Sequence, residues 1–201
     1  LHSFPTRRSS DLTADVANTT KEMTFTIPTE NLEGRTVVVF EKLIHEPSGT
    51  DVARHEDKDD EGQSIHYPEG HTNASDGQTE DAVGTVGENE IIVDEVTYKN
   101  LVIGDEYTVS GTLHYLEDCT GLNGDEYAAG DAVPDAEGKE YTASVTFTAE
   151  ENDGSVFLVY ELDSSVLKGI SVVVFEDFYT NGVKVYTHSD LDDEDQRIDY
   201  P

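Results

Sequence analysis

The sequence predicts an all-β protein built as an antiparallel sandwich, with one complete copy and one partial copy of the same module in tandem. Three observations predict this. Strand-like runs alternate with turn residues, no segment has apolar residues at the 3.6-residue period of a helix, and the sequence around the motif VVVFE occurs twice. Short strands of this kind, separated by Gly and Asn turns, are typical of an immunoglobulin-like sandwich.

The predicted strands of the complete copy are rich in β-branched and aromatic residues. They are IIVDEVTY (91–98), EYTVSGTLHYL (106–116), YTASVTFTA (141–149), SVFLVYEL (155–162), ISVVVFEDFY (170–179) and VKVYTHS (183–189). Asn181-Gly182 predicts a two-residue hairpin turn between the last two, because both turn positions need positive φ. A further strand should begin just after Tyr67-Pro68. Residues 163–168 allow at most one helical turn, and the acidic, Gly-rich stretch 118–139 is predicted to be a loop.

The repeat sets the expected domain organisation. EGRTVVVFEKLI in the first copy corresponds to KGISVVVFEDFY in the second, so residues 13–68 are the C-terminal part of a truncated repeat and residues 69–201 a complete domain. In the partial copy, TFTIP, TVVVFEKLI and DVARHED are predicted to be the last three strands. Without partner strands this part should be marginally stable by itself. Residues 1–12, LHSFPTRRSSDL, resemble a translated sequencing adaptor and are treated as a non-native leader.

Charge and cysteine content limit the function classes. The formal net charge is −32, with 12 Lys and Arg against 44 Asp and Glu, which argues against a nucleic-acid or anionic-membrane partner. Cys119 is the single cysteine, so no intramolecular disulfide can form. No apolar stretch is long enough for membrane insertion of this segment. No cofactor is expected: the acidic runs HEDKDDE and HSDLDDED lack the spacing of an EF-hand, so we predict solvated charge and no metal site. The isolated His114 is expected to be a packing or surface residue.

One set of four polar residues occurs in both copies. Glu41, His55, Asp60 and Gln63 recur in the same order as Glu176, His188, Asp193 and Gln196, and the spacing H-x4-D-x2-Q is unchanged.

Glu176 shares the apolar face of its strand with Val172 and Val174, where desolvation would raise its pKa. The alternative is that the strand ends at Phe175 and leaves Glu176 in solvent. The segment LDDED must turn or bulge if His188, Asp193 and Gln196 are to converge. The competing explanation is an exposed acidic turn that contains an incidental His and Gln.

Five features follow one another along the chain: HTNASD, VTYKNLVIGDEYTVSGTL, VVVFED, the hairpin at Asn181-Gly182 and H-x4-D-x2-Q. As an ordered set they resemble the VaFE repeats, or T-Q ester-bond domains, of Gram-positive surface adhesins. The resemblance covers nearly all of residues 69–201 and the tail of a preceding repeat at about 23–68. It implies that a threonine on the first strand attacks the side-chain amide of a glutamine on the last strand, which releases ammonia and leaves an intramolecular ester.

Transferred to this sequence, the resemblance makes Thr72 the nucleophile and Gln196 the electrophile, with Glu176, His188 and Asp193 as supporting groups. Thr79 and Thr85 remain possible nucleophiles. The rival crosslink between Lys and Asn needs a first-strand lysine, and residues 69–98 contain none.

The leading hypothesis is therefore a structural stalk module of an extracellular, cell-wall-attached adhesin, stabilised by a self-formed crosslink and without enzymatic turnover. Its partners would be neighbouring repeats of the same chain, with a host or glycan ligand bound through other domains. Two other hypotheses stay open. One is a ligand-binding module that uses the loop 118–139 or a sheet face, and the other is a hydrolase that uses Glu176 and His188.

Overall fold

The computed structural model describes residues 10–13, 16, 18–121 and 124–201, and most of the predicted leader (1–12) lies outside these ranges. The chain forms two units, Leu1–Glu33 and Gly34–Pro201. In the described part of the first unit the backbone forms turns but no strand, so the prediction of a strand at TFTIP (24–28) was wrong. A short apolar run becomes a strand only where another strand accepts its hydrogen bonds, and this one has no such neighbour.

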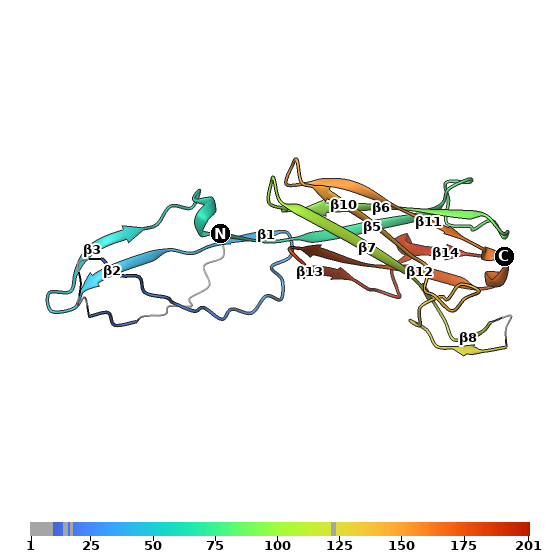
Figure 1. Cartoon of the computed structure of the whole chain (residues 1–201), viewed down its shortest axis with the longest axis horizontal. Coiled ribbons are helices and arrows are strands. Elements are labelled where there is room, and N and C mark those ends of the chain that lie inside the picture. The colour runs from blue at the N-terminus through green and yellow to red at the C-terminus, as the bar shows by residue number, and fades with distance from the viewer. Residues whose placement is uncertain (1–9, 14–15, 17, 122–123) are drawn as a thin grey trace. The chain divides into compact units, whose positions relative to one another are not determined.

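The complete copy is built around two main antiparallel sheets (Figure 1). The larger sheet has the order β10 (Thr142–Thr148), β7 (Glu106–Tyr115), β12 (Ser171–Thr180) and β13 (Val183–His188), and β14 (Arg197–Asp199) also pairs with β12. The smaller sheet has the order β11 (Gly154–Leu162), β6 (Glu90–Lys99) and β5 (Glu69–Asp76). The six predicted runs and the strand after Tyr67-Pro68 are all confirmed as strands.

The connections also follow the sequence pattern. Asn181 and Gly182 have φ of 50° and 73°, as the predicted hairpin turn between β12 and β13 requires. Residues 163–168 contain a single turn of 3₁₀ helix, η2 (Ser164–Leu167). In the described residues of the loop 118–139, the strands are the two-residue β8 (Cys119–Thr120) and β9 (Glu126–Tyr127), which pair with each other.

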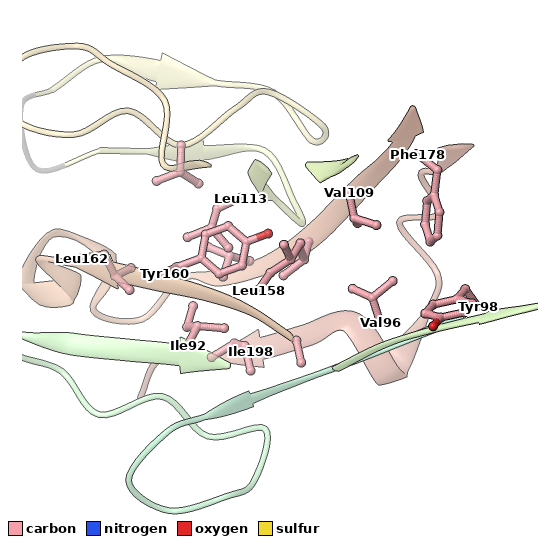
Figure 2. Packing of buried hydrophobic residues seen from close by; sticks show 14 of the residues in the cluster. Ile92, Val96, Tyr98, Val109, Leu113, Leu158, Tyr160, Leu162, Phe178 and Ile198 are labelled. Atoms are coloured by element: carbon pink, nitrogen blue, oxygen red, sulfur yellow. The ribbon is translucent and has the colours of Figure 1, made fainter. Parts of the chain in front are cut away.

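The core lies between the two sheets, and Figure 2 shows part of its packing. Along β12 the inward residues Val172, Val174 and Phe178 are fully buried, and β6 contributes Ile92 and Val96 from the opposite sheet. Each such side chain stabilises the fold by about 1.5–3 kcal/mol relative to an exposed position. This closed apolar layer makes the few polar groups inside it conspicuous.

In the partial copy, β1 (Arg35–Val38) pairs with β4 (Ser64–Tyr67), and β2 (Glu41–His45) pairs with β3 (Thr50–His55). The prediction that TVVVFEKLI forms one continuous strand is therefore wrong, since residues 39–40 separate β1 from β2. Its counterpart β12 stays continuous because β7 pairs with it from Val172 to Thr180. The boundary at residues 68/69 falls inside the unit Gly34–Pro201 and stays a prediction.

Candidate functional site

A gap along one edge of β12 positions the glutamine of the complete copy. β14 pairs with Ser171–Val173, β13 pairs with Glu176–Thr180, and the opposite edge of β12 is filled by β7. The chain returns from β13 to β14 through a 3₁₀ turn, η3 (Glu194–Gln196). Gln196 is the last residue of η3 and is fully buried. Gln196 thus lies in the turn just before the final strand. The resemblance had implied a position on the final strand itself.

Thr72 lies on the smaller sheet and faces this glutamine. The alternation of β5 buries Thr72, Ala74 and Asp76, and Thr72 is 1% exposed. The Nε2 atom of Gln196 donates a hydrogen bond to Thr72 Oγ1 at 2.5 Å, although the two residues are 124 positions apart in the chain. β5 and η3 therefore bring a buried hydroxyl and a buried carboxamide into direct contact.

The other two candidate threonines lie elsewhere. Thr79 follows β5 in an exposed turn, where its hydroxyl donates to Asp81 Oδ1 at 2.9 Å. The backbone N–H of Thr85 donates to Asp76 Oδ2 at 2.7 Å, in the loop that leads to β6. Neither residue is hydrogen-bonded to Gln196, so of the three threonines only Thr72 is placed beside the amide.

Glu176 contacts the nitrogen of the same amide. β12 continues through Glu176 to Thr180, so the alternative in which the strand ends at Phe175 is wrong. Glu176 is 1% exposed, and its Oε2 accepts a hydrogen bond from Gln196 Nε2 at 2.6 Å. One carboxyl oxygen therefore touches the atom that would leave as ammonia.

His188 and Asp193 form the outer part of the site. His188 Nε2 lies 3.2 Å from Asp193 Oδ2, and His188 Nδ1 lies 3.9 Å from Glu176 Oε2. Asp193 caps η3, where its Oδ1 accepts from the backbone N–H of Asp195 at 2.9 Å. The segment 190–196 therefore turns, as convergence of the three residues required, and the explanation as an incidental exposed turn is not supported.

Asp94 is a further site residue that the sequence analysis missed. It lies on β6, is fully buried, and interacts with the carboxyl group of Glu176. Burial raises the pKa of Asp94 to about 6, and burial together with the charge of Asp94 raises the pKa of Glu176 to about 10. These values belong to the pair, because two buried carboxylates this close keep one shared proton at neutral pH. The sequence did contain a signal for Asp94. In a strand it alternates with the apolar residues Ile92 and Val96 and so shares their inward face.

The partial copy holds the same four residues in a more open setting. His55 Nε2 lies 2.9 Å from Asp60 Oδ2, His55 Nδ1 lies 3.8 Å from Glu41 Oε2, and Gln63 Nε2 donates to Glu41 Oε2. The Glu41 side chain is 44% exposed, whereas that of Glu176 is 0% exposed. Among the described residues no threonine hydroxyl is hydrogen-bonded to Gln63. The local turn thus assembles these four groups without the second sheet.

Other predicted features can be placed briefly. His114 is half-buried, stacks on Phe175 with ring centroids 4.3 Å apart, and its Nδ1 lies 2.9 Å from Gly130 O, so it packs in the sheet. Within the described ranges, no group of His, Cys, Asp or Glu has an arrangement that could hold a metal ion. In the same ranges no helix has the length and apolar character needed to cross a membrane.

Comparison with known proteins gives one family and several solved structures. Two crystal forms of an adhesin from Mobiluncus mulieris, described as containing intramolecular disulfide, isopeptide and ester bond cross-links, match with 16% identity and a TM-score of 0.47. They cover 67% of this chain and 57% or 58% of the adhesin chain. A putative β-galactosidase from Bacteroides fragilis matches with 10% identity and a TM-score of 0.36, over 58% of this chain and 15% of its own. No curated protein matches the chain.

The family comparison is the decisive one. A model described as the T-Q ester bond containing domain matches residues 3–67 and again residues 68–200. The two matches follow the tandem repeat and together span nearly the whole sequence. The chain therefore belongs to the family of T-Q ester bond containing domains.

Proposed function

We propose that the complete copy is a structural module of a bacterial surface adhesin, in which Thr72 and Gln196 join in an intramolecular ester. The single observation that supports this most directly is the buried contact of 2.5 Å between Thr72 Oγ1 and Gln196 Nε2. A threonine and a glutamine so far apart in sequence share this buried position with the carboxyl groups of Glu176 and Asp94, and His188 and Asp193 lie on its outer side.

The proposed reaction balances without any added reagent. Thr72 Oγ1 attacks Cδ of Gln196, so that an O–C bond forms, the Cδ–Nε2 bond breaks, and the nitrogen leaves as ammonia. Glu176 Oε2 lies 2.6 Å from Nε2 and is placed to give the leaving nitrogen a proton. The Asp94–Glu176 pair then regains the proton that the threonine hydroxyl loses. The pair ends in its starting state, and the net change is the loss of one ammonia.

The surroundings of this pair have two roles in the proposal. The imidazole of His188 lies 3.2 Å from Asp193 and 3.9 Å from Glu176 Oε2, on the outer side of Glu176, where it shields that carboxyl group from solvent. The burial of Thr72 and Gln196 keeps water away from the finished ester, which would otherwise hydrolyse. The same desolvation therefore raises the pKa of the acid and protects the product.

The location of the bond suggests a mechanical role. An ester between Thr72 on β5 and Gln196 beside β14 would tie the first strand of the module to the last. Tension applied at the ends of the module would then pass through a covalent bond and would not separate the strands. The reaction occurs once per chain, so the module is not an enzyme with turnover. The proposed partners are neighbouring repeats, in a parent protein attached to the cell wall that meets its host or glycan ligand through other domains.

The intact mass of the full chain tests this proposal. Wild-type protein is expected to be lighter than its sequence by about 17 Da, the mass of one ammonia, and a protease digest should contain a branched peptide that joins Thr72 to Gln196. Thr72→Val and Gln196→Ala should each restore the full sequence mass. Recovery of both segments as separate, unmodified peptides from folded wild-type protein would refute the proposal.

A further inference from the structure

Tyr160 reaches across the sandwich from the sheet opposite Glu176. It lies on β11, is 2% exposed, and its ring is part of the core in Figure 2. Its hydroxyl occupies space left by the absent side chain of Gly111, because a Cβ on Gly111 would meet Tyr160 Oη at 1.9 Å. Gly111 is the direct partner of Glu176 in the ladder between β7 and β12. The phenol therefore ends beside the strand position that carries the site carboxyl.

The hydroxyl is also close to Asp94. In the ladder between β11 and β6, Tyr160 pairs with Ile92, and Leu158 pairs with Asp94, so the phenol and the carboxyl are diagonal neighbours on the inward face. The core on this side thus brings one phenol to two carboxyl groups, one from each sheet.

Several buried polar atoms at this place have no hydrogen-bond partner, and they include both a donor and possible acceptors. Tyr160 Oη is buried and has no hydrogen-bond partner, and both Asp94 oxygens and Glu176 Oε1 lack one at ordinary hydrogen-bond distance, although the two carboxyl groups are near enough to share a proton. A buried donor without a partner is costly, and buried carboxylate oxygens are the acceptors it would need. Burial, followed by the charges of Asp94 and Glu176, raises the pKa of Tyr160 well above its usual value, so the phenol stays a donor.

We propose that Tyr160 is a positioning residue for ester formation, whose hydroxyl donates a hydrogen bond to the Asp94–Glu176 pair when that pair carries one negative charge. The inference rests on the proposed Thr72–Gln196 reaction. By stabilising the charge on Asp94, the phenol keeps the remaining proton on Glu176, where Gln196 Nε2 can take it. Tyr160 forms no bond and transfers no proton in this scheme.

Few charged groups lie near the phenol of Tyr160. β6 contributes Asp94, β12 contributes Glu176, and β7 contributes only Gly111 at the contact. His188 and Asp193 act on the far side of Glu176. A change in the pH dependence of ester formation after removal of the hydroxyl therefore reports on the carboxyl pair.

The test compares Tyr160→Phe with wild type in the full chain. Protein is made by cell-free synthesis, folded in buffers between about pH 5 and pH 9, quenched in denaturant at successive times, and weighed intact to follow the loss of ammonia. The Tyr160→Phe protein should react about tenfold more slowly at neutral pH. The acidic limb of its rate profile should also move upward by about one pH unit, because the pair holds its second proton more tightly without the phenol.

Tyr107→Phe is the matched control. Tyr107 is a core residue of the same module, but its hydroxyl accepts from the backbone N–H of Val102 at 3.0 Å, away from the carboxyl pair. This variant should keep the wild-type rate and pH profile. A second variant, Gly111→Ala, places a methyl group where the Tyr160 hydroxyl lies and should reproduce the shift if it folds.

The outcomes separate the two proposals. If wild type loses ammonia and Tyr160→Phe matches it in both rate and pH profile, then the phenol is a packing group and this inference is overturned. If wild type loses no ammonia at any pH, the Thr72–Gln196 reaction itself is refuted, and the role of Tyr160 is refuted with it. Equal slowing of Tyr160→Phe and Tyr107→Phe without a pH shift would also overturn the inference.

Discussion

Replacing Thr72 by valine should remove most of the covalent stabilisation of the complete module. Valine keeps the shape of threonine but has no hydroxyl, so the ester cannot form. The bond would close a loop of 124 positions, and a crosslink over this length restricts the unfolded chain by about 4–5 kcal/mol in the chain-entropy model. The unreacted variant also keeps the Gln196 amide, and one N–H of Nε2 has no acceptor once the Thr72 hydroxyl is gone, at a further cost of about 1 kcal/mol. The expected loss in the free energy of unfolding is therefore about 5–6 kcal/mol.

Urea unfolding followed by circular dichroism measures this loss. Since a domain of this size has an m-value of about 1–3 kcal/mol per molar urea, the unfolding midpoint of Thr72→Val should fall by about 2–6 M relative to the crosslinked wild type. The intact mass of each sample is recorded alongside, so that the fraction of crosslinked chains is known and only fully reacted wild type enters the comparison.

Thr79→Val is the matched control for this experiment. It removes a hydroxyl from an exposed turn that follows the same strand, where the hydroxyl contacts only Asp81. Its ammonia loss and midpoint should equal those of wild type. The reasoning fails if Thr72→Val still loses ammonia, since another nucleophile would then be at work. It also fails if fully crosslinked wild type and Thr72→Val unfold within about 1 kcal/mol of each other, because loop closure would then contribute little.

Three further predictions concern single residues. Peptide mapping of the full chain should recover Gln63 as an unmodified amide and show the loss of one ammonia in total, and a second loss would contradict this. Wild type is expected to form the ester more slowly as the pH drops through about 6, where the carboxyl pair takes up its second proton. Asp94→Asn should slow ester formation and abolish this fall in rate. An unchanged acidic limb would exclude the pair as proton acceptor. Burial raises the pKa of Glu90 above its ordinary 4.5, so its contribution to stability is complete below that pH and is lost as the pH rises through the raised value. Glu90→Gln, which still accepts from Tyr200, should therefore gain stability over wild type in thermal unfolding as the pH rises from 4.5 to neutral, and a constant difference would argue against this.

The fold of the complete module could be predicted because its local signals agree with its tertiary structure. Alternation along 155–162 and 91–98 matches two neighbouring strands of the smaller sheet, and Asn181-Gly182 adopts the turn that its residue types favour. The same signals failed at TFTIP and across residues 35–45. Strand formation depends on a partner strand, and the apolar pattern of one segment contains no information about whether that partner is present.

The candidate site could be predicted only in the part that the repeat duplicates. Glu176, His188 and Gln196 were found because the first copy repeats them. Asp94 and Tyr160 lie on β6 and β11, which have no counterpart among the described strands of the partial copy, so no second occurrence marked them. Their signal was weaker: a carboxylate and a phenol on inward faces of apolar strands. Recognising such residues needs the burial and the distances that only the assembled sandwich supplies.

The two copies together indicate when the proposed reaction can occur. In both, a turn brings the glutamine nitrogen to a glutamate and pairs a histidine with an aspartate. Among the residues that the structure describes, a second sheet covers these groups only in the complete copy, where Thr72 and Asp94 join them. Because the pKa of Glu176 is raised by burial, the acid needed for ester formation exists only after the smaller sheet has docked. The crosslink should therefore form last, and it would seal only those modules that have already folded completely.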